Sequence, residues 1–136
     1  MKTATTAAQM LIRFTGLLAL ILGILFWTGS AGALVPVHML LGIILVLSLW
    51  TLAFLGARAG VNWGLVVLAV LWGLLTVALG MVQVRLLPGS LHWIIEVLHL
   101  LIGLAAIGQG EALGARIKRR ETAGTSGQPT LASGGR

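Results

Sequence analysis

Four long apolar runs set the strongest limit on what this chain can fold into. They cover about residues 9–29, 34–57, 62–87 and 91–116, and each is long enough to cross a bilayer core of roughly 30 Å as a helix. Of the 136 residues, 58% are apolar and 9% are charged, and the mean hydropathy is +1.05. Soluble domains of this size do not have such a composition. The sequence therefore predicts an all-α integral membrane bundle of four helices.

Short polar breaks separate the four runs and favour an up-down-up-down bundle. Pro36 suits a first helical turn, while Asn62 and Ser90 suit the N-caps of the third and fourth helices. After the fourth run the chain is first basic and then rich in Gly, Ser and Thr. We therefore assign residues 1–116 to the bundle and 117–136 to a basic tail that is disordered beyond about residue 121.

The basic residues indicate how the bundle lies in its membrane. One end carries nearly all of them: Lys2, Arg13, Arg58, Arg116, Lys118, Arg119 and Arg120. Arg85 is the only basic residue expected at the other end. The positive-inside rule then predicts a bacterial inner membrane protein with both termini in the cytoplasm. Since no soluble basic face exists, the expected partner is the lipid bilayer and not nucleic acid.

The two halves of the chain repeat the same motifs in the same order. The segment Val37-His38-Met39-Leu40-Leu41-Gly42 returns as Leu98-His99-Leu100-Leu101-Ile102-Gly103. A pair of glycines seven residues apart precedes each segment: Gly16 and Gly23, then Gly73 and Gly80. We interpret the chain as an internal 2+2 helix repeat, whose copies are related by an axis along the membrane normal. The first run therefore counts as a bundle helix, although Ala31-Gly32-Ala33 resembles a signal-peptidase site.

The repeated histidines are the first candidates for chemistry. His38 and His99 precede Arg58 and Arg116 by 20 and 17 residues, so their depths differ by about one helical turn. Two imidazoles that face each other across a bundle suit the two axial positions of one haem iron. Interhelical hydrogen bonding is the alternative role. With no cysteine in the chain, thiol catalysis and Cys-ligated metals are excluded.

The repeated glycines are candidates for making room for a flat macrocycle. Gly42 and Gly103 lie one turn beyond the histidines on the same helix faces. Gly16, Gly23, Gly73 and Gly80 are expected to do the same on the first and third helices. Close helix packing in lipid is the alternative explanation for any of these glycines.

The fourth helix carries a second polar constellation. His92, Glu96, His99 and Gly103 follow one helix face. Glu96 is predicted to orient an imidazole or to pass protons, while a single Zn, Cu or Mn ion held by His92, Glu96 and His99 is an alternative. His92 also remains an alternative to His99 as the iron ligand. Arg85 is expected to pair with a haem propionate, or else to anchor the chain at the interface.

These features resemble membrane b-type cytochromes of the cytochrome b561 kind and one four-helix half of the haem A synthase family. The likeness rests on the Val-His-x-Leu-Leu-Gly pattern and on Glu96 and His99, which match an E-x-x-H of that family. Two positions depart from it, because Val35 replaces a glutamate and Leu100 replaces an arginine. The resemblance implies haem b, and haem A synthase chemistry would need a second bundle half. An electron carrier is therefore expected rather than a catalyst.

Three functional hypotheses follow. The first is one low-spin haem b held by His38 and His99 in the outer half of the bundle, for electron transfer with a quinone or a redox protein, or for sensing or carrying haem. The second is a cofactor-free accessory subunit of a larger respiratory or photosynthetic complex, or a homo-oligomer. The third is a metal-ion or proton carrier that uses His92, Glu96 and His99.

Overall fold

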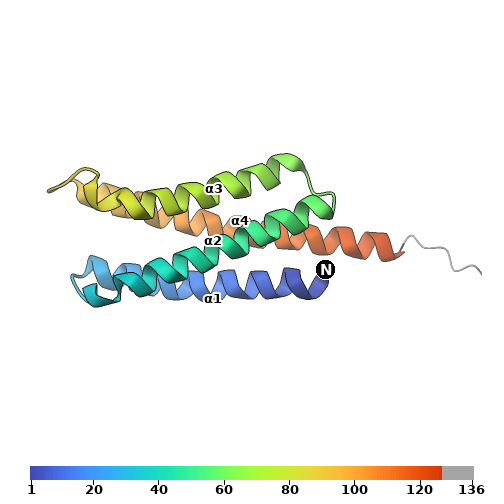
Figure 1. Cartoon of the computed structure of the whole chain (residues 1–136), viewed down its shortest axis with the longest axis horizontal. Coiled ribbons are helices and arrows are strands. Elements are labelled where there is room, and N and C mark those ends of the chain that lie inside the picture. Colours follow the sequence, from blue (N-terminus) through green and yellow to red (C-terminus); the bar gives the residue numbers. More distant parts are fainter. Residues whose placement is uncertain (127–136) are drawn as a thin grey trace, which may run out of the picture.

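The chain folds into four long helices that alternate in direction (Figure 1). The structure is a computed structural model, and it describes residues 1–126. The helices and the two short 3₁₀ turns between them are α1 (Lys2–Trp27), η1 (Gly32–Leu34), α2 (Val35–Arg58), α3 (Trp63–Val82), η2 (Gln83–Arg85) and α4 (His92–Ser126). All four helices are long and apolar enough to cross a membrane. The predicted all-α four-helix membrane bundle is confirmed.

Two helix boundaries differ from the prediction at the ends of the first and third helices. α1 begins at Lys2 rather than near residue 9, because Thr5 and Ala8 are buried against the other helices and packing extends the helix past the apolar run. α3 ends at Val82 rather than near residue 87. The chain there tightens into η2 and then turns through Leu87, whose φ of 46° no helix can hold.

The fourth helix is longer than the sequence analysis allowed. α4 continues to Ser126 instead of ending at residue 116, so the disorder expected beyond about residue 121 is wrong for 122–126. Ile117, which is 0% exposed, holds this extension against Gly56 of α2. The same prediction for 127–136 lies outside the residues that the structure describes.

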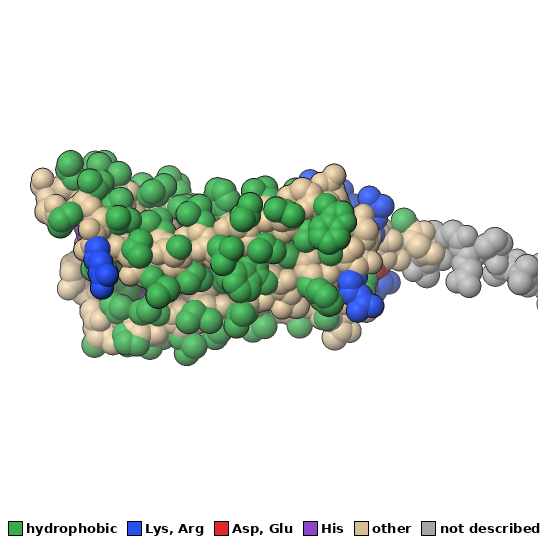
Figure 2. All heavy atoms as spheres, turned by 45° about the horizontal axis from the view of Figure 1, so that its top comes forward, with side chains coloured by type: hydrophobic (Ala, Val, Ile, Leu, Met, Phe, Trp, Pro, Cys, Tyr) green, Lys and Arg blue, Asp and Glu red, His purple; other side chains and the backbone are tan. Residues whose placement is uncertain are grey.

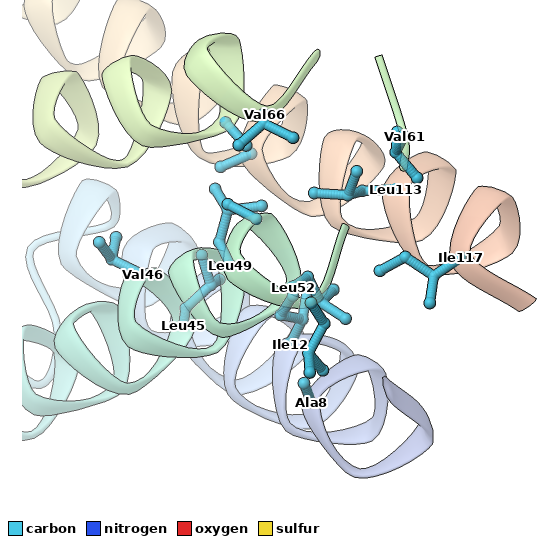
Figure 3. Close-up of a cluster of buried hydrophobic side chains, with 14 residues drawn as sticks. Ala8, Ile12, Leu45, Val46, Leu49, Leu52, Val61, Val66, Leu113 and Ile117 are labelled. Carbon is cyan, nitrogen blue, oxygen red and sulfur yellow. The ribbon is translucent and has the colours of Figure 1, made fainter. Parts of the chain in front are cut away.

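The largest hydrophobic core lies toward the end of the bundle where α1 begins. α2 and α4 contact each other through the middle, and α1 and α3 each pack against both of them. Figure 3 shows the central side chains of this core: Ala8, Ile12, Leu45, Val46, Leu49, Leu52, Val61, Val66, Leu113 and Ile117. Toward the other end a smaller cluster joins Leu79, Ile95 and Ile102. Hydrophobic side chains also cover the long outer surface, as a lipid-facing protein requires (Figure 2).

The packing of the glycines follows the sequence repeat. A side chain at Gly16 would meet Ile107 of α4, and one at Gly73 would meet Val46 and Trp50 of α2. Val46 and Ile107 each lie eight residues after the histidine of their own unit. The contact of α1 with α4 is therefore the counterpart of the contact of α3 with α2. Gly16 and Gly73 serve close helix packing, which corrects the expectation that they make room for a macrocycle.

Trp72 links α3 to α4 in the smaller cluster. Its indole Nε1 donates a hydrogen bond to the carbonyl of Ile102 at 3.0 Å. Trp72→Phe, which removes the donor but keeps an aromatic ring, is expected to lower the free energy of unfolding by about 1 kcal/mol. Equilibrium unfolding in mixed detergent micelles, followed by circular dichroism, measures this. Trp93→Phe is the control, since Trp93 is 53% exposed, and an equal loss there would contradict the prediction.

Candidate functional site: the histidine pair

His38 and His99 meet inside the bundle, near the end where α2 and α4 begin. Their ring centroids are 6.2 Å apart and the ring planes are inclined by 54°. His38 lies in the first turn of α2, and His99 lies about two turns into α4. Both side chains are half-buried. The two helices that contact each other through the middle of the bundle therefore bring the repeated histidines together.

Each imidazole has a glycine of its own unit beside it. A Cβ at Gly23 of α1 would lie 3.9 Å from His38 Cε1, and a Cβ at Gly80 of α3 would lie 3.2 Å from His99 Cε1. Phe26 adds an edge-on contact to His38, with ring centroids 5.4 Å apart and an interplanar angle of 69°. Gly23 and Gly80 thus let the backbones of α1 and α3 approach the two rings.

The buried ring nitrogens of the two histidines have few hydrogen-bond partners in the bundle. Nδ1 of His38 and Nδ1 of His99 are buried and make no hydrogen bond within ordinary geometric limits. The Ala19 carbonyl of α1 is a hydrogen-bond acceptor beside the His38 ring. Buried polar atoms are nearly always paired in proteins, and those that are not are often associated with a functional role or with a ligand. Packing within the described chain leaves the Nδ1 atoms of these rings without a side-chain partner.

One turn beyond each histidine lies a glycine at which a side chain would meet no neighbour. A Cβ at Gly42 or at Gly103 would meet no atom within 4 Å. These two glycines therefore do not serve close packing in the described chain, in contrast to Gly16 and Gly73. The expectation that Gly42 and Gly103 make room for a macrocycle stays a prediction.

The distance between the rings fits two ligands of one metal ion. A metal–imidazole bond is about 2 Å, and a ring nitrogen lies about 1.1 Å from the ring centre, so two opposed ligands have ring centres about 6 Å apart. The observed distance of 6.2 Å agrees with this. The donor set of two imidazoles, with open space at Gly42 and Gly103, fits an iron porphyrin.

The outer polar residues do not join this pair. His92 Nδ1 donates to the Leu86 carbonyl at 3.0 Å, and His92 Nε2 lies 4.0 Å from a carboxylate oxygen of Glu96. His99, not His92, is the ring beside His38. Arg85 is exposed in η2 and makes no salt bridge within residues 1–126.

The alternative metal site on α4 is not assembled. Among the described residues no three His, Cys, Asp or Glu side chains are grouped closely enough to hold a metal ion. His92 and His99 are two helical turns apart, roughly 10 Å along the axis, which is too far for one ion. The prediction of a Zn, Cu or Mn ion on His92, Glu96 and His99 is therefore wrong.

The sequence analysis missed a charged cluster in the other half of the bundle. Arg13 Nε and Nη2 donate to the two carboxylate oxygens of Glu111, each at 2.7 Å, and Gln9 Nε2 donates to Oε2 at 3.3 Å. Arg13 had been counted only as a topology signal, and Glu111 had no role. Arg13 and Glu111 each stand alone in an apolar run and carry opposite charges. Because an unpaired charge is costly in a membrane, this pattern could have predicted that the two residues form an ion pair.

Comparison with protein-family models, with curated proteins and with solved structures gave no significant match. The chain is thus classed by its own fold and site. It is an all-α, multi-pass membrane bundle with a paired-histidine centre.

Proposed function

We propose that this chain binds one haem b through His38 and His99 and carries electrons in a membrane. The observation that carries the proposal is the ring separation of 6.2 Å between two histidines at equivalent places of the repeat. The open space at Gly42 and Gly103 supports it. So does the buried Nδ1 of His99, which has no hydrogen-bond partner.

The residues around the pair have distinct parts in this proposal. His38 and His99 would both bind the iron, and two imidazole ligands would favour electron transfer over oxygen activation. When bound, haem supplies one-electron redox chemistry. Gly23 and Gly80 keep the space beside the two rings free of side chains. Arg85 lies in η2, between α3 and α4, and it is proposed to pair with a haem propionate.

The location is part of the same proposal. Basic side chains gather at the end of the bundle that leads into the C-terminal segment (Figure 2). By the positive-inside rule this end faces the cytoplasm of a bacterial inner membrane, and the histidines lie in the outer half. The electron partner is then a quinone in the bilayer or a redox protein at the outer surface.

Absorption spectra of the detergent-purified protein test the proposal. The wild type, from cells supplied with haem, is expected to show a sharp Soret band and split α and β bands after reduction with dithionite. His38→Ala is expected to lose these bands while keeping its helical circular dichroism. His92→Ala is the matched control and is expected to keep them, because its ring binds the Leu86 carbonyl instead.

A colourless wild-type protein would overturn the haem proposal. The cofactor-free accessory subunit or homo-oligomer would then be the remaining candidate. In that case the double replacement of His38 and His99 by alanine is expected to reduce assembly with the partner, measured by blue native electrophoresis. The haem proposal thus predicts that His38 and His99 control the absorption bands, whereas the accessory-subunit alternative predicts that they control assembly.

A further inference from the structure

Three arginines share one exposed face of α4 where this helix leaves the bundle. Arg116, Arg119 and Arg120 are spaced i, i+3 and i+4, so their side chains are neighbours on the helix surface. All three are exposed. We call them the three-arginine face. Since the fourth helix was expected to end at residue 116, this face could not be identified from the sequence pattern.

The three-arginine face is attached to the bundle at a defined height. Ile117, beside Arg116, is 0% exposed and packs at Gly56 of α2, so the helix is fixed where the arginines begin. Arg116 also lines a small cavity together with Leu65 and Gln109, which places it near the start of α3. Arg119 and Arg120 follow on the part of α4 that extends out of the bundle, and the packing of Ile117 restrains the orientation of this extension.

The start of α3 indicates the level of the bilayer surface. Trp63, the first residue of α3, is 69% exposed, and exposed tryptophans concentrate at the boundary between acyl chains and headgroups. The layer of lipid phosphates lies on the aqueous side of this boundary. The three-arginine face begins at Arg116, which shares a cavity with Leu65 in the first turn of α3, and it extends from there out of the bundle toward that layer.

The nearby charges leave the face strongly positive. Glu121 is the only acidic residue of α4 beyond Arg116, and at about 100° per residue it does not share the face. Arg58 is turned elsewhere, with its guanidinium 5.9 Å from the Phe54 ring centroid. Guanidinium groups bind phosphate oxygens in bidentate fashion, and clusters of them concentrate anionic lipids.

We propose that the three-arginine face binds the phosphate of an anionic phospholipid in the leaflet that this end of the bundle contacts. The site is independent of the histidine pair, and it needs no assumption about which side of the membrane is cytoplasmic. The lipid would hold the α4 extension at the surface through charge-assisted hydrogen bonds.

Lipid retention by the full-length protein tests this proposal. The protein is reconstituted in vesicles of equal parts phosphatidylcholine and phosphatidylglycerol, extracted gently and analysed by native mass spectrometry. The wild type is expected to retain phosphatidylglycerol in preference to phosphatidylcholine. Arg119→Gln with Arg120→Gln is expected to lower that retention roughly 10- to 30-fold, which is about three- to fivefold for each arginine.

Lys2→Gln with Lys118→Gln is the matched control. It removes the same charge from the same end, but neither lysine belongs to the three-arginine face. This pair is expected to retain phosphatidylglycerol as the wild type does. An equal loss in both double variants would overturn the proposal, since net charge alone would then explain binding. Equal retention of the two lipids by the wild type would overturn it as well.

Discussion

Replacing Gly42 and Gly103 together by leucine is expected to abolish the haem absorption and to leave the bundle folded. A Cβ at either position would meet no other atom within 4 Å, so a side chain can be added there without a clash at its first atom. Leucine also favours a helix over glycine by roughly 0.5–1 kcal/mol per residue, so the free energy of unfolding should not fall. Under the proposed function the two side chains occupy the space of the macrocycle.

The haem-to-protein ratio and the unfolding curve of this double variant together check the prediction. Gly108→Leu is the control, because a Cβ at Gly108 also meets no atom within 4 Å and the residue lies further along α4 than Gly103. Its Soret band is expected to match the wild type. Full haem binding by the double variant would show that the space at Gly42 and Gly103 is not where a cofactor lies.

Replacing Gly73 by leucine is expected to have the opposite profile and to destabilise the bundle itself. A Cβ at this position would lie 2.5 Å from Trp50 Nε1 and 3.0 Å from Val46 Cγ1. Trp50 is held by a hydrogen bond from Nε1 to the Val70 carbonyl at 3.3 Å, so its ring cannot withdraw without losing that bond. Overpacking of this kind lowers the free energy of unfolding by roughly 1–3 kcal/mol.

Equilibrium unfolding in mixed micelles measures the loss at Gly73. Gly108→Leu again serves as the control, since it adds the same side chain at a position where a Cβ meets no atom within 4 Å. A Gly73→Leu protein as stable as the wild type would mean that α2 and α3 can separate at little cost. The contact at Gly16, its counterpart in the repeat, would then lose its assigned role too.

The sequence predicted the bundle because membrane-spanning length and composition depend on local residues alone. The sequence also predicted that His38 and His99 lie close together, because a repeat whose copies cross the membrane in the same direction places equivalent residues on opposite sides of one axis. Their ring centroids are 6.2 Å apart. The identity of the nearer histidine of α4 did not follow from spacing. It depends on how far α4 slides along α2, which packing at Gly56 and Leu113 decides.

Features that depend on contacts between distant segments could not be predicted. The ends of α1 and α4 are set by buried Thr5, Ala8 and Ile117, not by hydropathy. The division of the glycines is of the same kind: Gly16 and Gly73 meet side chains of another unit, while Gly42 and Gly103 meet none. All four look alike in the sequence, and only the partner helix distinguishes them.

The ion pair of Arg13 and Glu111 has a consequence for the order in which the chain enters the membrane. The two residues are 98 positions apart, and they join the first helix to be synthesised to the last. Arg13 therefore has no acidic partner in the bilayer until α4 arrives. Closing so long a loop is a late step in folding. The bundle is thus completed when α4 inserts and Glu111 pairs with Arg13 of α1.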